Sequence, residues 1–275
     1  MNSFYQNWEL DQELPMVIHR SEDLDFYPHF HAEVEFVYVK SGRIRVGVNK
    51  ESRLLGQGDM AIIGSNDIHY YDSRGLGSVI FIVIFHPEMI GKAGGWPSGV
   101  RFDTPFICGG QHDLAPLIRP LLERIFREKR DALPGHELFI QASLSELCGT
   151  LMRRLEVTNI PPAQDEADPG RERIQQILSY IETHYREDLS VETISSHFKM
   201  GPSYFCRMFK KNVGMNFKTF LNTIRVHSAK RKLESSGASI TEIALECGFG
   251  SIRTFNRVYR KFQGHAPSEF RKEMK

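Results

Sequence analysis

The last third of the chain repeats one residue pattern at a distance of fifty residues. The recurring pairs are Glu192 and Glu242, Phe205 and Phe255, Arg207 and Arg257, Phe209 and Tyr259, Lys211 and Lys261, Gly214 and Gly264, and Phe220 and Phe270. A repeat at a fixed period indicates one supersecondary unit that is used more than once. Each copy predicts two short helices joined by a tight turn, with Arg and Lys exposed on the second helix.

Turn and capping residues mark the helices of the first copy. Ser190 is a predicted N-cap, and Pro202 suits the first position of the second helix because its missing N–H is not needed there. Residues 200–202 form the predicted turn, and Gly214 ends the second helix. The residues expected to face the core are Val191, Ile194, Phe198, Phe205, Met208 and Phe209.

A longer helix is predicted between the copies, over residues 216–234. At 1.5 Å per residue it spans roughly 28 Å, which is close to the separation of adjacent major grooves on one face of DNA. In the second copy, Ser239 and Ser251 are predicted N-caps and residues 247–249 form the turn. Duplex DNA is therefore the first partner to consider.

The exposed side chains of the two second helices suit DNA recognition. Arg pairs with guanine and Asn with adenine through two hydrogen bonds each, whereas Lys and Ser more often contact phosphates. The predicted base readers are Arg207, Arg253, Asn256 and Arg257. The predicted backbone contacts are Lys210, Lys211, Arg260 and Lys261, with Ser203, Tyr204 and Ser251 as further DNA-binding candidates. Taken singly, each residue could equally be a solvated surface group.

The charge of the chain is distributed unevenly. Residues 171–275 carry 19 Lys+Arg and 10 Asp+Glu, a net charge of +9, and the remaining 16 basic and 24 acidic residues give −8, so the whole chain has +1. A basic region joined to an acidic one is typical of a polyanion-binding module attached to a domain of another kind.

The C-terminal motifs resemble the DNA-binding domain of the AraC/XylS family of bacterial transcriptional regulators. The resemblance covers roughly residues 172–272 and rests on ITEIALECGF (240–249), FNRVYRKFQG (255–264) and PSEFR (267–271). It implies two helix-turn-helix units joined by a long helix, bound to one face of promoter DNA. Family analogy adds a homodimer, contact with RNA polymerase and action as an activator. The first unit departs from the family pattern, because residues 214–217 (GMNF) lack the proline kept at Pro267.

The N-terminal part predicts short strands with glycine turns over residues 15–105. The clearest strands are 33–39, 43–48, 60–63 and 78–85, which indicate a sandwich or small barrel. Two amphipathic helices follow from residue 112, separated by Pro134-Gly135. Their apolar stripes comprise Leu114, Leu117, Ile118, Leu121, Leu122, Ile125 and Phe126, then Leu138, Phe139, Ala142, Leu147, Leu151 and Leu155. These stripes pack on the barrel or against a second subunit.

Residues 159–170 (NIPPAQDEADPG) are rich in proline and acid and predict a linker. The predicted class is therefore α+β. We expect a cupin-like barrel with two helices over residues 1–158 for effector binding and dimerisation, the linker, and an all-α double helix-turn-helix domain over 171–275.

Two segments of the barrel resemble cupin motifs. HFHAEVE (29–35) resembles the first, and GDMAIIGSNDIH (58–69) resembles the second, with Gly64 and Asn66 where that family has proline and glycine. The resemblance implies that His29, His31, Glu35 and His69 correspond to ligands of Mn, Fe, Ni or Zn. Alternation along a strand would place residues 29, 31, 33 and 35 on one face.

The same residues also suit a pocket for an organic effector, with His and Glu as hydrogen-bonding groups, or a purely structural role. Further effector-binding candidates are Arg20, Tyr27, Tyr38, Tyr71 and, less strongly indicated, His19. Aromatic and polar groups in a barrel mouth suit a sugar or a similar polar metabolite.

The leading hypothesis is a one-component transcriptional regulator controlled by a small effector in the barrel. The alternatives are a metal-dependent cupin enzyme with an appended DNA-binding domain and an architectural DNA-binding protein without a ligand. We expect no enzymatic activity, since no acid, base or nucleophile beyond the quartet can be assigned.

Composition favours a soluble, cytoplasmic protein without a membrane partner. The four cysteines lack CxxC spacing and suit reduced thiols. Residues 1–16 are not typical of a signal peptide. The longest apolar run, residues 79–85, is too short to cross a membrane.

Overall fold

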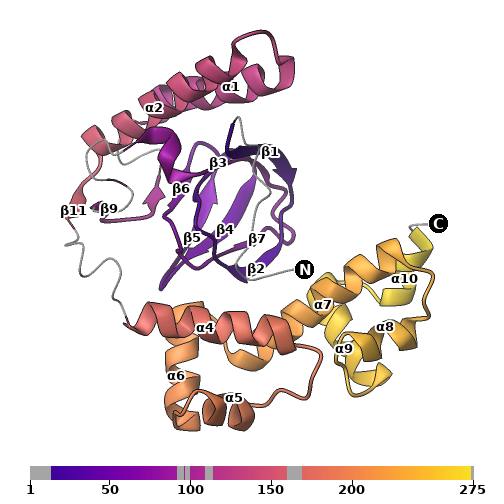
Figure 1. The fold of residues 1–275 in the computed structure, drawn as a ribbon. Coiled ribbons are helices and arrows are strands. Elements are labelled where there is room, and N and C mark those ends of the chain that lie inside the picture. Colours follow the sequence, from indigo (N-terminus) through magenta and orange to yellow (C-terminus); the bar gives the residue numbers. More distant parts are fainter. Residues whose placement is uncertain (1–13, 92–95, 97–99, 109–113, 160–168, 274–275) are drawn as a thin grey trace. The chain divides into compact units, whose positions relative to one another are not determined.

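The computed structural model describes residues 14–91, 96, 100–108, 114–159 and 169–273. They form two compact units, which divide between Glu172 and Arg173. The middle of the predicted linker, residues 160–168, lies outside the described residues. Its ends carry regular structure, because Asn159 closes strand β11 (Val157–Asn159) and Pro169 begins helix α4 (Pro169–His184). Figure 1 shows the order of the elements.

The first unit is built from antiparallel strands in two main sheets. One sheet has the order β1 (Met16–Glu22), β8 (Val79–Phe85), β3 (Val34–Ser41), β6 (Met60–Ile63) and β10 (Phe106–Ile107). The other has the order β2 (Phe26–His29), β7 (His69–Asp72), β4 (Arg43–Val48) and β5 (Glu51–Gly56). Strand β9 (Val100–Phe102) pairs with β11, and a short 3-10 helix, η1 (Pro87–Ile90), follows β8. The four strands predicted most clearly correspond to β3, β4, β6 and β8, with bounds that differ by two residues at most.

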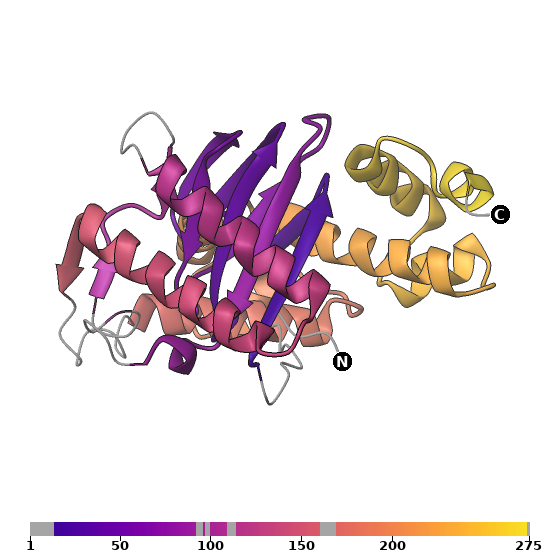
Figure 2. The same cartoon turned by 90° about the horizontal axis from the view of Figure 1, so that it is seen from above.

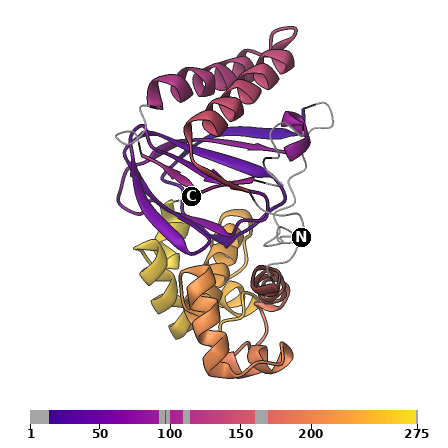
Figure 3. The same ribbon diagram turned by 90° about the vertical axis from the view of Figure 1, so that its left-hand side faces the viewer.

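The five-stranded sheet has two different buried faces because side chains alternate along each strand. On β3, Val37 and Val39 pack between the two sheets with Val46 and Ile82. Val34, Phe36 and Tyr38 point the other way, into a core covered by the helices. Figures 2 and 3 show α1 (Ala115–Asp131) and α2 (His136–Arg154) outside this face. On β3, odd-numbered residues therefore join the core between the sheets, and even-numbered residues join the core under the helices.

The two helices bury a narrower stripe than the sequence predicts. The buried residues that line the core are Leu114, Ile118, Leu122 and Ile125 near α1, and Ile140, Leu144, Leu147 and Leu151 on α2. Leu117, Leu138, Phe139 and Ala142 belong to the predicted stripes but are exposed in the single chain. Leu138 is 71% exposed, since the buried face of α2 follows Ile140 at steps of four, three and four.

The second unit is helical throughout its regular elements (Figure 1). After α4 come α5 (Val191–His197), α6 (Pro202–Val213), α7 (Phe217–Ser235), α8 (Ile240–Glu246), α9 (Ile252–Gln263) and α10 (Pro267–Glu273). Ser190, Ser239 and Ser251 are N-caps whose side chains accept backbone hydrogen bonds, as predicted. Gly214 ends α6 with a φ of 79°, a conformation that glycine adopts without strain.

Aromatic residues form the cores of both helix-turn-helix units. Phe205, Phe209, Phe217 and Phe220 contact one another in the first unit. In the second, Phe255, Val258 and Tyr259 pack against α7 and α8. In the first helix-turn-helix unit, three residues that were predicted to be buried are only half-buried: Val191, Phe198 and Met208.

The repeat has two registers rather than one. Between α6 and α9 the offset is fifty residues, but α5 and α8 differ by forty-nine. The capping residue equivalent to Glu242 is therefore Thr193, and the predicted pairing of Glu192 with Glu242 was wrong. The turn after α8 is one residue longer than the turn after α5, which restores the larger offset.

Among the helices that the structure describes, none combines the length and the apolar character needed to cross a membrane.

Candidate nucleic-acid interface and metal-ligand cluster

The helices α6 and α9 each bury one face and expose the other. On α6 the exposed candidates are Ser203, Tyr204, Arg207, Lys210 and Lys211. Tyr204 is a large aromatic residue that is nevertheless 57% exposed. Each helix thus presents a polar, basic surface opposite a phenylalanine core.

On α9 the exposed candidates are Ser251, Arg253, Asn256, Arg257, Arg260 and Lys261. Two of them have partners within the protein. Ser251 caps the helix by accepting from the Thr254 N–H, and Arg260 lies 3.6 Å from Glu269. The side chains of Arg253, Asn256 and Arg257 make no hydrogen bond or ion pair within the described part of the chain. They are available to bond an external partner.

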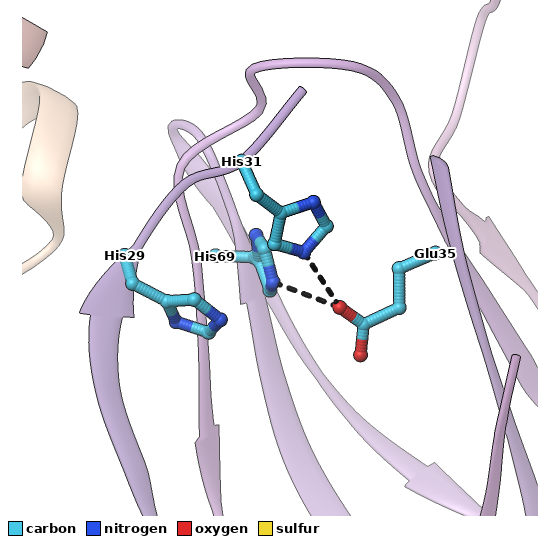
Figure 4. A group of neighbouring side chains, drawn as sticks. All are labelled: His29, His31, Glu35 and His69. Carbon is cyan, nitrogen blue, oxygen red and sulfur yellow. Dashed lines mark hydrogen bonds and ion pairs between the residues drawn. The ribbon is translucent and has the colours of Figure 1, made fainter. Parts of the chain in front are cut away.

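The structure brings His29, His31, Glu35 and His69 together in the first unit (Figure 4). One ligand atom from each residue lies within 4.8 Å of the others, and all four residues are buried. His31 Nε2 lies 2.9 Å and His69 Nε2 3.2 Å from the same oxygen, Glu35 Oε2. Four potential metal ligands therefore converge on one buried point.

These residues reach that point from both sheets. His29 ends β2 and pairs with His69 of β7, whereas Glu35 belongs to β3 of the other sheet. His31 lies on the crossing between them, outside the main strands. The prediction that residues 29–35 share the face of one strand was wrong, because β2 ends at His29 and β3 begins at Val34.

Backbone hydrogen bonds set the tautomer of each imidazole. The Nδ1 atoms of His29, His31 and His69 lie 3.0, 3.1 and 2.9 Å from the carbonyl oxygens of Tyr27, Glu33 and Asp67. A carbonyl only accepts, so each Nδ1 donates its proton. In the neutral imidazoles the Nε2 lone pair is then directed to the cluster, as metal-bound histidines require.

Electrostatics also favour a cation at this point. Burial alone would raise the pKa of Glu35, but the hydrogen bonds and charges of His31 and His69 hold it well below its usual range. Burial, followed by the neighbouring His69 and His31, lowers the pKa of His29 well below its usual value. A metal ion would take the place of the Nε2 protons in these hydrogen bonds and accept lone pairs from the carboxylate and the imidazoles together. The donor set therefore fits a divalent transition metal.

Tyr71 and Glu33 surround the cluster. Tyr71 donates a hydrogen bond of 2.6 Å to Glu35 Oε1, which leaves Oε2 facing the histidines. A carboxylate oxygen of the buried Glu33 lies 3.5 Å from His31 Nδ1. The sequence alone indicated Tyr71 only as an effector candidate, and it placed Glu33 on the same face as His31 and Glu35 without identifying it as a site residue.

The two departures from the cupin pattern have a local explanation. Asn66 has a φ of 61°, a left-handed conformation that Asn tolerates better than most residues and that suits the glycine of the family. The Gly64 N–H donates to Asp67 Oδ2 at 2.8 Å, which a proline could not do. Asn49 holds the other oxygen of Asp67, and the carbonyl of Asp67 orients His69.

The remaining effector candidates lie apart from the cluster or at its edge. Tyr38 faces the helix-covered core, because its offset of three residues from Glu35 reverses its side of the strand. Arg20 pairs with Phe81 on that same face and forms an exposed ion pair with Glu22. His19 faces the other way, and burial lowers its pKa more than Glu35 raises it. Tyr27 contributes its carbonyl to His29 and stacks on Phe26.

Two domain families match the chain. Residues 19–85 match the cupin domain and residues 194–273 match a helix-turn-helix domain. An HTH-type transcriptional regulator of Staphylococcus aureus is 35% identical over 100 residues, which are 36% of this chain and 13% of that protein. This chain therefore corresponds to a small part of such relatives.

Other similar proteins have nearly the same length. The HTH-type transcriptional activator RhaS of Escherichia fergusonii is 26% identical over 258 residues, covering 90% of this chain and 87% of RhaS. The crystal structure of ToxT from Vibrio cholerae is 14% identical, covers 96% of this chain and 99% of its own, and has a TM-score of 0.46. The chain therefore combines a cupin domain with a helix-turn-helix domain, and it is similar over most of its length to a transcriptional activator.

Proposed function

We propose that the chain regulates transcription by binding duplex DNA through α6 and α9 together. The observation that carries this proposal is the set of exposed Arg, Asn and Lys side chains on both helices, opposite well-packed cores. Arg253, Asn256 and Arg257 supply base readers that have no partner within the described protein. RhaS is named a transcriptional activator, and we extend activation to this chain by that likeness. We propose contact with RNA polymerase and a cytoplasmic location from the resemblance to the AraC/XylS family.

We further propose that the barrel binds a divalent transition metal through His29, His31, Glu35 and His69. The support is the convergence of four buried ligands and the three oriented imidazoles. Zn, Ni, Fe and Mn all accept imidazole and carboxylate ligands. The ion would supply positive charge that links the two sheets, because its ligands come from both.

An organic effector is the second candidate for the barrel. Tyr71, Glu35 and the histidines could bind a polar metabolite such as a sugar through hydrogen bonds. We favour the ion because the side chains of His31 and His69 are 0% exposed and that of Glu35 is 2% exposed, which suits a ligand of atomic size. Whatever is bound controls transcription only if its affinity differs between two states of the protein.

A metal-dependent enzyme with an appended DNA-binding domain is an alternative that the quartet alone supports. The similar proteins are named transcriptional regulators, which favours a sensing role for the barrel.

We also propose that the chain forms a homodimer through helices α1 and α2, which follow the barrel. Leu117, Leu138 and Phe139 are exposed there at 42%, 71% and 48%. A second copy would cover these side chains.

The DNA proposal is tested by selecting a binding site from randomised duplexes with the full chain. Arg257→Ala should then weaken binding to the selected site by about 1–3 kcal/mol and relax specificity at one base position. Arg130→Ala, a substitution on the exposed end of α1, is a control for general charge loss. Unchanged binding by Arg257→Ala would show that α9 is not a recognition helix.

The metal proposal is tested by elemental analysis after expression and after incubation with Zn²⁺, Ni²⁺, Fe²⁺ or Mn²⁺. We expect one ion per chain, lost in His31→Ala and His69→Ala but kept in His86→Ala, a surface histidine beside Glu88. A wild-type protein that takes up no metal would favour the organic effector instead.

A further inference from the structure

The chain between α4 and α5 lies against the turn of the second helix-turn-helix unit. Gly248, in the turn between α8 and α9, has a φ of 82°. A Cβ at this position would meet the Tyr185 carbonyl oxygen at 2.7 Å and the Cα and carbonyl oxygen of Arg186 at 2.8 Å. These distances are too short for any side chain, so the two backbones are in direct contact.

Arg225 of α7 holds the same segment from the side. Its Nε donates to the Tyr185 carbonyl and its Nη2 to the Glu187 carbonyl, both at 2.7 Å. Its guanidinium also lies 5.9 Å from the ring centre of Phe249, the residue after Gly248. A planar guanidinium can bridge two carbonyls in this way, and a lysine ammonium cannot reproduce that geometry.

Side-chain hydrogen bonds add a second connection. The Tyr185 hydroxyl lies 2.9 Å from Ser228 Oγ on α7, and the Arg186 Nε donates to that hydroxyl. The Cys247 thiol lies 3.7 Å from the same Ser228 oxygen. We call Arg225, Gly248 and residues 185–187 the clasp, because together they join the segment before α5, helix α7 and the turn between α8 and α9.

The first helix-turn-helix unit offers a comparison within the same chain. The residue equivalent to Gly248, two positions after the helix end, is Lys199, which has a φ of 52°. A lysine therefore occupies the left-handed conformation in one turn, at a modest energetic cost. The glycine in the other turn is therefore required by the close approach of residues 185–186 rather than by φ alone.

We propose that the clasp fixes the position of α9 relative to α6, so that the protein accepts one spacing between the two elements of its DNA site. This inference rests on the proposed DNA binding. One extra base pair moves an element by about 3.4 Å and rotates it by roughly 35°. A clasped pair of helices cannot follow that change without breaking the Arg225 and Gly248 contacts, whereas helices joined only by α7 could bend at its ends.

The experiment uses the full chain and the duplex selected from randomised DNA. The spacing between the two elements is then varied by one and two base pairs in either direction, and Kd is measured for each duplex. Wild-type protein should lose at least about 10-fold in affinity per base pair of change, a loss within the usual range for a mismatched base pair. Arg225→Lys and Gly248→Ala should reduce that difference to about 3-fold or less.

Two controls separate the possible outcomes. Arg225→Lys keeps the charge, so a general loss of attraction to DNA is not expected, and Lys199→Ala alters the equivalent turn without a clasp. Wild type that tolerates all spacings, or variants that keep the wild-type preference, would overturn the inference. Failure of wild type to bind any duplex would instead overturn the proposed function. If Gly248→Ala does not fold, Arg225→Lys still decides the question. Its spacing preference is measured as above, and its amide exchange at residues 247–249 should be faster than in wild type.

Discussion

The two helix-turn-helix units share their architecture but present different side chains at equivalent positions. Arg207 and Lys211 recur as Arg257 and Lys261. At the other exposed positions Ser203 corresponds to Arg253, Tyr204 to Thr254 and Cys206 to Asn256. The second helix-turn-helix unit therefore holds three of the predicted base readers, Arg253, Asn256 and Arg257, and the first holds one, Arg207. We infer that the second unit discriminates sequence, while the first mainly adds affinity and register.

The largest expected effect tests this division directly. Asn256→Ala should cost about 1–3 kcal/mol of binding free energy at the selected site, because it removes the pairing with adenine that we propose for Asn256. Cys206→Ala, the equivalent change in the first unit, should alter affinity by much less. Kd values for both variants on one duplex give the comparison, and equal losses would contradict a division of labour.

A core position provides the second test. Tyr259 is fully buried, and its hydroxyl has no hydrogen-bond partner in the described structure, whereas the equivalent residue in the first unit is Phe209. Burial raises the pKa of Tyr259 far above its usual value. Tyr259→Phe should be neutral or stabilise the protein by about 1 kcal/mol, and Phe209→Tyr should destabilise it by about 1–3 kcal/mol. Denaturant unfolding measures both, and a clear loss in Tyr259→Phe would reveal a partner for the hydroxyl.

The smallest expected effect concerns the two capping boxes. Ser190 and Ser239 cap α5 and α8 alike, so either Ser→Ala change should cost about 1 kcal/mol. Only the second capping box contains a titratable side chain, because Glu242 occupies the position that Thr193 has in the first. Hydrogen bonds from the backbone N–H and side chain of Ser239 lower the pKa of Glu242.

The sign of the pH effect follows from that lowered pKa. The stability that Glu242 contributes is present above its unfolded pKa and is lost as the pH falls through the folded value. The melting temperature of wild type should therefore decline more on acidification below about pH 4.5 than that of Glu242→Gln. Thr193→Val, which removes the equivalent cap, should leave this pH dependence unchanged. Identical acid profiles for wild type and Glu242→Gln would show that the box does not hold in solution.

Much of the structure of the C-terminal half, residues 173–273, can be predicted from residues that are close together in the sequence. Ser190, Ser239 and Ser251 lie next to the helices that they cap, and Phe205 and Phe209 lie one helical turn apart. The cluster ligands could be named from their motifs, but not their arrangement. His31 lies on a crossing between two sheets, and no periodicity within residues 29–35 reveals where one strand ends.

The sequence by itself determined the features that depend on local spacing: the repeat, the caps, the exposed basic faces and the identity of the four residues that cluster in the barrel. Only the tertiary structure decided which apolar residues of α2 are buried, why Tyr38 lies apart from Glu35, and why Gly248 is a glycine. The physical reason is range. Helix caps and amphipathic faces arise from contacts three or four residues apart. The metal-ligand cluster and the clasp join segments separated by 34 residues (Glu35 to His69) and 40 residues (Tyr185 to Arg225), and only folding brings these together.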